Sequence, residues 1–154
     1  MTRNIMATLV VASGTLLASH VQAEAPKGWK TIKDNGKGQC QMAVPESWKL
    51  AMLMGQPLGS ADSPDKKSSA VVNAVNMPFA QSKGLIVQSL KVTKMIEDSA
   101  TRQVFEFSGL GAKPGNLNLY IGIKTGNGTC NAQISVPPSQ TDVGQKIAAS
   151  LGAS

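Results

Sequence analysis

The sequence predicts an α+β fold, in which a mostly antiparallel sheet carries a mid-chain helix and a C-terminal helix packed on it. Apolar and polar residues alternate with strand periodicity in several short segments, most regularly over 117–124 and 130–136. Asn127 and Gly128 lie between these two segments and are typical of a tight hairpin, so the two strands are expected to be antiparallel neighbours. Two other segments space their apolar residues as amphipathic helices do.

Residues 1–23 have the features of a secretory signal peptide and are left out of the predicted fold. Arg3 precedes a mostly apolar stretch over 5–17, and small residues favour cleavage after Ala23. This stretch is shorter than the roughly 20 residues that span a bilayer, and no later segment of the sequence reaches that length. We therefore expect an exported protein, periplasmic or extracellular, that does not span the membrane and folds as a single domain over 24–154.

Two short strands are predicted near the start of this domain. A lysine-rich, turn-like arm leads into the first, at 29–33, and a polar turn separates it from the second. Apolar and polar residues alternate from Cys40 to Val44, and this strand stops at Pro45, because proline cannot donate to a central ladder. The segment 48–69 collects Gly, Pro, Ser and Asp, which predicts a long surface loop, a frequent location of binding sites.

The middle of the chain predicts a strand, a helix and then a strand meander. "AVVNAVNMP" is expected to be a strand that ends at Pro78. The segment 80–92 has apolar residues four positions apart, which favours a helix. Alternating segments at 94–98, 102–108 and 117–124 then predict successive antiparallel strands.

A second amphipathic helix is predicted at the end of the chain. Val143, Ile147 and Leu151 form an i, i+4, i+8 stripe that suits packing on a sheet. Ser139 or Thr141 is the expected N-cap, and the glycine after Leu151 is the expected C-terminal stop.

The absence of histidine beyond the signal peptide restricts the chemistry. His20 is the single histidine of the sequence, so the exported chain lacks Ser-His and Cys-His pairs and histidine-based zinc or copper sites. Cys40 and Cys130 lie on the apolar faces of their strands, and an oxidising compartment favours a disulfide between them. We therefore expect no enzyme, no catalytic residue, no cofactor and no metal ion.

Several shorter motifs suggest enzymes but have simpler interpretations. "SPDK" begins at Ser63 and "KTG" at Lys124, as in serine β-lactamases and penicillin-binding proteins, but there is no S-D-N element. A proline also follows the serine directly, in a polar loop. Glu97, Asp98 and Glu106 are carboxylates of the kind that glycosidases pair, and solvated strand faces explain them better. A hydrolase without histidine therefore remains a distant alternative.

Charge indicates where a partner could bind. Removal of the signal peptide leaves fourteen basic residues against nine acidic ones, a formal charge of +5 carried almost entirely by lysine. An unidentified protein, an anionic macromolecule or an anionic surface would suit such a chain, whereas the scarcity of arginine and the export argue against nucleic acid. The candidate contact residues are Lys27, Trp29, Lys30, Lys33 and Lys37 of the arm, and Trp48 where the predicted loop starts.

A soft-metal carrier is the alternative binding function. Met52 and Met54, together with Met42, could supply thioether sulfurs, which suit Cu(I). Met42 shares its strand face with Cys40, however, and methionine also fills irregular gaps in protein cores. Packing is therefore the preferred interpretation of these side chains.

The order of predicted elements resembles the PsbP-like fold. A strand leads into "VPESW" and a loop into "AVVNAVNMP", and a helix, a strand meander and a final helix follow. PsbP is an extrinsic subunit of photosystem II, and this fold also occurs in a small Ran-binding nuclear import factor and in secreted bacterial proteins. The resemblance implies a non-catalytic module that docks to a partner, although a disulfide between early and late strands is not part of the pattern. It carries no functional residue across, because a fold does not define a function.

Overall fold

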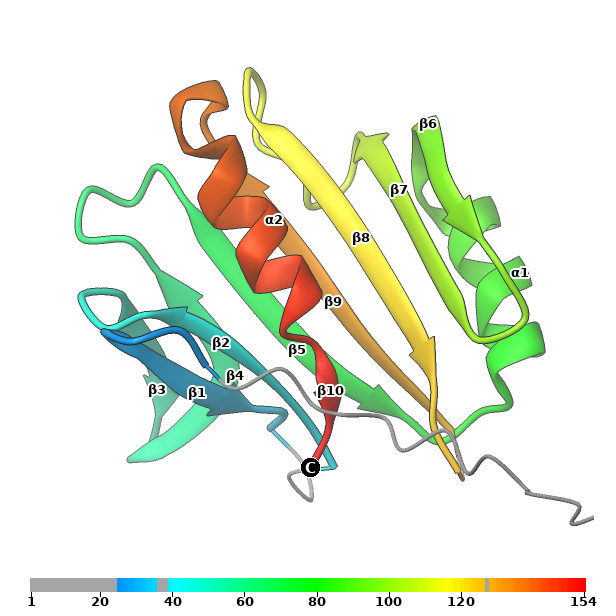
Figure 1. The fold of residues 1–154 in the computed structure, drawn as a ribbon, viewed down its shortest axis with the longest axis horizontal. Coiled ribbons are helices and arrows are strands. Elements are labelled where there is room, and N and C mark those ends of the chain that lie inside the picture. The colour runs from blue at the N-terminus through cyan, green and yellow to red at the C-terminus, as the bar shows by residue number, and fades with distance from the viewer. Residues whose placement is uncertain (1–24, 36–38, 127) are drawn as a thin grey trace, which may run out of the picture.

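A seven-stranded antiparallel sheet runs through the centre of the computed structural model, which describes residues 25–35, 39–126 and 128–154 (Figure 1). Its strands, in chain order, are β3 (Lys49–Leu53), β4 (Gln56–Asp62), β5 (Ser69–Val75), β6 (Lys91–Asp98), β7 (Arg102–Ser108), β8 (Leu117–Lys124) and β9 (Thr129–Val136). They lie in the order β3-β4-β5-β9-β8-β7-β6. The predicted signal peptide lies outside the described residues.

A second, three-stranded sheet and two α-helices complete the architecture. The small sheet has the order β1-β2-β10, in which both neighbouring pairs are antiparallel. Its strands are β1 (Trp29–Lys33), β2 (Cys40–Pro45) and β10 (Gly152–Ala153). The helices are α1 (Phe79–Ser89) and α2 (Thr141–Ala149), and a 3₁₀ turn, η1 (Pro138–Gln140), precedes α2.

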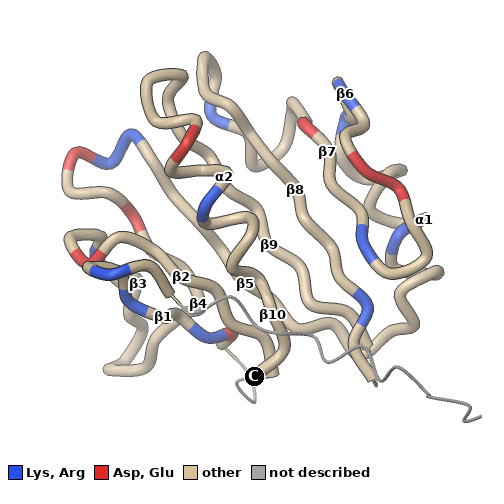
Figure 2. The backbone as a smooth tube through the Cα atoms, viewed as in Figure 1, with Lys and Arg blue, Asp and Glu red and all other residues tan. Residues whose placement is uncertain are grey.

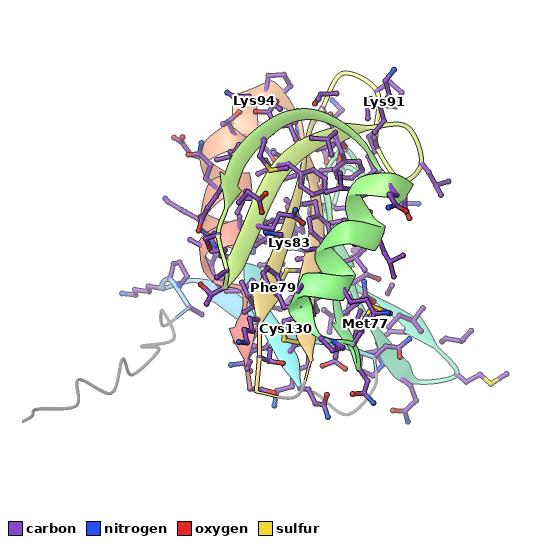
Figure 3. The ribbon with its side chains drawn as sticks, turned by 90° about the vertical axis from the view of Figure 1, so that its right-hand side faces the viewer. Met77, Phe79, Lys83, Lys91, Lys94 and Cys130 are labelled. Carbon is purple, nitrogen blue, oxygen red and sulfur yellow. A yellow bond between two sulfur atoms is a disulfide. The ribbon has the colours of Figure 1, made fainter. Side chains whose placement is uncertain are left out.

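The two α-helices cover opposite faces of the large sheet. In Figure 3, α1, marked by Phe79 and Lys83, lies on one side of the strands, and the salmon-coloured α2 lies on the other. The alternation along β8 explains this arrangement. Leu119 and Ile121 belong to a core cluster shared with α2, whereas Tyr120 belongs to a second cluster on the α1 side. The α+β class with helices on a mostly antiparallel sheet is therefore confirmed.

The main core lies between the large sheet, the small sheet and α2. Val44 of β2, Val72 of β5 and Ile147 of α2 are fully buried in it. The predicted disulfide between Cys40 and Cys130 is present, and it joins β2 of the small sheet to β9 of the large one. It connects two sheets between which no described strands pair.

Most predicted strands are confirmed, and so is the antiparallel pairing of β8 with β9. Asn127 of the predicted hairpin turn lies outside the described residues. The long surface loop expected over 48–69 is wrong, because β3 and β4 form a hairpin there. The apolar residues of this hairpin follow one another without alternating with polar ones. A strand prediction that relies on alternation therefore does not detect β3 and β4.

The end of the chain also differs from the prediction. The N-cap of α2 is Gln140, and its side chain makes no capping hydrogen bond, while the Thr141 hydroxyl donates to the Pro138 carbonyl at 2.9 Å. The predicted stop glycine, Gly152, lies in β10 and pairs with Gln41. Strand pairing after the helix, which depends on distant residues, therefore replaces a local termination motif.

Candidate functional site

The β3–β4 hairpin gathers exposed apolar side chains at one edge of the large sheet. The exposed fractions are 54% for Met52, 59% for Leu53 and 96% for Met54, and Leu50 is also exposed. No charged residue occurs over 50–61. Figure 2 shows the outer end of this hairpin without charge, at the lower left, and in Figure 3 the teal hairpin extends beyond the neighbouring strands. We refer to residues 52–57 as the hairpin tip.

A two-residue turn closes the hairpin tip. Leu53 pairs with Gln56, and the residues between them, Met54 and Gly55, have φ angles of 49° and 79°. Positive φ at both positions is the type I′ arrangement, which matches the twist of paired strands. Glycine adopts it readily, whereas methionine rarely does. The turn therefore holds an apolar side chain out into solvent at a position where a polar residue is usual.

The base of the hairpin is fixed tightly to the body of the protein. Gly59 of β4 has a φ of 67°, and a Cβ there would lie 2.8 Å from the Val72 carbonyl oxygen and 3.1 Å from the Asp34 Cα. β4 therefore passes in close contact with β5 and with the chain that follows β1, and the tip projects from a rigid base.

The predicted basic arm lies beside this base, because β1 contacts β4. Lys27 and Lys33 are exposed, whereas Trp29 and Lys30 are half-buried. The Lys30 Nζ donates to the Glu46 carbonyl oxygen at 2.9 Å, and Trp29 packs against the main core. Of the predicted contact residues of the arm, Lys37 lies outside the described residues.

Trp48 does not belong to the exposed surface that the sequence suggested. Its side chain is 4% exposed and lies in the main core, and its backbone N–H donates to the Pro45 carbonyl at 3.0 Å. The expectation that Trp48 contacts a partner is therefore corrected: this indole holds the start of β3 against the core. The sequence placed Trp48 on the surface because residues 48–69 were predicted to form a loop.

The methionines considered for Cu(I) are separated by the fold. Met42 is 1% exposed in the core, whereas Met54 is 96% exposed at the tip, so these two sulfurs do not share a ligand set. Met52 is also exposed, on the strand that leads to the turn. Among the described residues, no group of three or more His, Cys, Asp or Glu side chains is placed to hold a metal ion.

The serine considered as a nucleophile is held within a turn between β4 and β5. The Ser63 hydroxyl donates to Asp65 Oδ1 at 2.6 Å and accepts from the Ser68 backbone N–H at 2.9 Å. The hydrogen bond from Ser63 is the main cause that lowers the pKa of Asp65 below its usual value. This serine therefore serves the geometry of the turn.

The lysine of the second motif lies at the other end of the large sheet. Lys124 pairs with Thr129, and Thr129 pairs with Val75 at the far end of β5. Ser63 lies just before the near end of β5, whose seven residues span about 20 Å. The serine and this lysine therefore do not form a common site.

Glu97, Asp98 and Glu106, from which a glycosidase-like pair could have come, each contact a basic side chain instead. Adjacent positions in a strand face opposite sides, so Glu97 and Asp98 do not share a face. The ion pairs are Arg102–Glu97 at 2.9 Å, Lys94–Glu106 at 3.8 Å and Lys83–Asp98. These groups are exposed or half-exposed, so their interactions contribute little to stability.

A buried polar group lies beneath α1, on the face away from the disulfide. The Tyr120 ring stacks on Phe105 with centroids 4.8 Å apart, and Tyr120 is 1% exposed. Burial raises the pKa of Tyr120 to about 12, and a hydrogen bond with Ser82 opposes this effect. Nearby in the sheet, the Oε1 of Gln103 is buried without a hydrogen-bond partner in the described part of the protein. This enclosed region supports α1 and is not open to a substrate.

The glycine-rich segment between β7 and β8 borders a shallow pocket of about 490 Å³. The polar groups around it are used to hold loops in place. Lys113 donates from its backbone N–H to Asn118 Oδ1 at 2.9 Å, and from its Nζ to the Lys66 carbonyl at 3.1 Å. The Asn116 amide donates to the Lys67 carbonyl at 2.8 Å. These hydrogen bonds therefore join the loop between β7 and β8 to the loop between β4 and β5.

Comparison with known proteins defines the fold. No protein-family profile matches the chain, and no curated protein matches its sequence. Among solved structures, the solution structure of cyanobacterial PsbP (CyanoP) from Synechocystis sp. PCC 6803 covers 89% of this chain and 99% of its own, with a TM-score of 0.55 and 8% identity. The protein therefore has a PsbP-like fold, as the order of its sequence elements predicted. At this identity, the similarity shows the fold alone.

Proposed function

We propose that the protein is an exported, non-catalytic binding module, folded as one domain over 24–154, that docks on a macromolecular partner through the β3–β4 hairpin. The observation that carries the proposal is the hairpin tip, which exposes Met52, Leu53 and Met54 in a segment without charge. Exposed apolar side chains that gather in one place mark interaction surfaces more often than scattered ones do. The exposed lysines of the basic arm, beside the hairpin base, are placed to contribute to the same contact.

Export is supported by the signal-peptide features and by the disulfide, because disulfides persist in oxidising compartments. The absence of catalysis is supported by the local roles of the candidate groups. Ser63 is held in a turn, and the three carboxylates form ion pairs. None of the described helices is long and apolar enough to cross a membrane.

The test compares capture by the tagged protein with capture by a hairpin variant. Met52→Thr, Leu53→Thr and Met54→Asn together remove the apolar side chains, while threonine suits strands and asparagine suits the turn. Leu110→Ser is the matched control, because Leu110 is 86% exposed on another loop. We expect material cross-linked in the native envelope or medium to be retained by the control and lost with the hairpin variant. Equal capture by all three proteins would reject the proposed function.

A further inference from the structure

The apolar surface of the hairpin tip continues around the whole tip. Met52 and Leu53 are consecutive in β3 and face opposite sides of the hairpin, yet both are more than half exposed. Met54 adds an almost fully exposed side chain at the turn. A flat protein surface would cover one of these faces, and a strand added to β3 would cover its edge. A medium that surrounds the tip would cover all of them.

The backbone of the tip suits shallow burial in an apolar medium. β3 and β4 pair with each other through Leu53 and Gln56, which satisfies their facing polar groups. Among the described strands, none pairs with the outer edge of β3, and unpaired backbone groups are costly in the hydrocarbon core. The tip therefore suits the interfacial layer of a bilayer rather than its centre.

Positive charges lie behind the tip at a matching distance. Lys49 begins β3, and Lys33 precedes Asp34, whose Cα lies against Gly59 of β4. Gly59 is three residues from the start of β4 at Gln56, which corresponds to about 10 Å along a strand. Interfacial segments are buried by about 5–10 Å, so Lys33 would lie at the level of the headgroups when the tip is immersed. Lys49 is four residues from Leu53, about 13 Å along the strand, and would lie just behind that level. Asp62 pairs with Lys49 in the register, while Lys27 of the arm adds further exposed positive charge.

We propose that the hairpin tip inserts into the interface of an anionic lipid bilayer, with the neighbouring lysines on the headgroups. This inference rests on the proposed function, since it names the partner that the same hairpin binds. The uncharged tip provides the apolar contact, and the lysines behind it provide complementarity to negative lipids. A protein pocket and a second copy of this chain are the other occupants that the experiment distinguishes.

The experiment is flotation of the full exported chain with vesicles of phosphatidylcholine alone or mixed with phosphatidylglycerol. We expect binding to the anionic vesicles, weakened by added salt because the lysine contacts are screened. The triple hairpin variant should lose at least about tenfold in partitioning, as expected from three apolar groups withdrawn from the interface. Leu110→Ser should bind as the parent does. Met54→Asn alone replaces the triple variant if the latter does not fold, and a several-fold loss is then expected.

A second measurement reports immersion of the tip directly. Leu53→Trp places an indole on the hairpin, and its emission should shift to shorter wavelength and be quenched by lipids brominated in their acyl chains. Quenching no greater than that of the parent, which has Trp29 and Trp48, would overturn the proposal. So would vesicle binding that survives the triple variant but is lost when Lys27, Lys30 and Lys33 become Gln.

The remaining outcomes separate this inference from the proposed function. If the parent protein binds none of the vesicles but still captures a protein through the hairpin, the lipid proposal fails and the proposed function stands. A dimer that the triple variant abolishes, without vesicle binding, would equally overturn the lipid proposal in favour of a second copy. If neither capture nor flotation depends on the hairpin, both proposals fail.

Discussion

Met54 has a backbone conformation and an exposure that are both unusual for methionine. It holds a φ of 49° in a two-residue turn, where Asn or Asp before the glycine is usual, and its side chain is 96% exposed. Neither the backbone nor the packing of the described structure favours methionine there. Binding through the side chain would account for both departures.

Met54→Asn should therefore stabilise the protein while weakening its docking. Asparagine adopts positive φ more readily, so we expect the free energy of unfolding to rise by about 0.5–1 kcal/mol, seen as a higher urea midpoint. Met54→Val is the comparison, and it should be less stable than the parent because a β-branched residue is strained at positive φ. A lower midpoint for Met54→Asn would contradict the turn geometry.

Tyr120 makes the stability of the protein depend on pH under alkaline conditions. Its pKa in the fold is about 12, above the value of about 10 in an unfolded chain. Between these two pH values the unfolded state loses a proton that the native state retains. The contribution of Tyr120 to the free energy of unfolding is therefore fully present below about pH 10 and is lost as the pH rises to about 12. The loss from this group amounts to at most about 3 kcal/mol.

Ultraviolet absorbance of tyrosinate measures this titration directly, because Tyr120 is the single tyrosine of the sequence. The native protein should ionise near pH 12 or together with unfolding, and the urea-denatured protein near pH 10. Ionisation near pH 10 with the native circular dichroism intact would show that the ring is not desolvated.

At the scale of elements, the two edge strands of the large sheet differ. β6 carries the exposed Lys91 and Lys94 and two register shifts, which are common protections against edge pairing. β3 begins with Lys49 and has one register shift, but its outer half is apolar and uncharged. β6 also exposes Met95 and Ile96, but these lie between charged residues, so the contrast supports the proposed docking through the β3–β4 hairpin.

A buried hydroxyl group, that of Ser150, links the end of α2 to β2 of the small sheet. Ser150 Oγ accepts from the Ala43 backbone N–H at 2.8 Å and donates to the Ile147 carbonyl at 2.7 Å, in a buried position. Ser150→Ala should leave that N–H unsatisfied and lower the free energy of unfolding by about 1–3 kcal/mol in chemical denaturation. Ser89→Ala, which removes an exposed helical hydroxyl, should change it by less than about 0.5 kcal/mol. Equal effects of the two substitutions would show that this link does not matter.

At the scale of the whole molecule, the disulfide is a covalent cross-link between the two sheets. Cys40 and Cys130 are 90 residues apart, so the bridge restricts the unfolded chain strongly. The double variant Cys40→Ala/Cys130→Ala should lose up to about 4–5 kcal/mol of unfolding free energy relative to the oxidised parent, measured by denaturation, and the reduced parent should lose a similar amount. Intact mass should show the oxidised parent two hydrogens lighter than the reduced one. An unchanged unfolding midpoint after reduction would contradict this role.

Local patterns in the sequence were enough to predict the elements whose apolar residues recur with a strand or helix period. The alternation in 117–124 and 130–136 located β8 and β9, and apolar placement of both cysteines predicted their pairing. These signals are local, because side chains on one face of a strand repeat every two residues and those on one face of a helix every 3.6. The order of such elements was also sufficient to indicate the PsbP-like fold.

Only the tertiary structure decided what lies on each face and at each edge. It formed a hairpin where a loop was expected, buried Trp48, placed α1 and α2 on opposite faces, and added β10 to the small sheet. A hairpin exposed on both faces has no apolar alternation, so nothing local marks it as strand. Whether an apolar residue becomes core or contact surface depends on which distant segment covers it. The sequence therefore determined the strands and helices with periodic apolar residues, together with the disulfide, and the long-range packing determined the candidate docking surface.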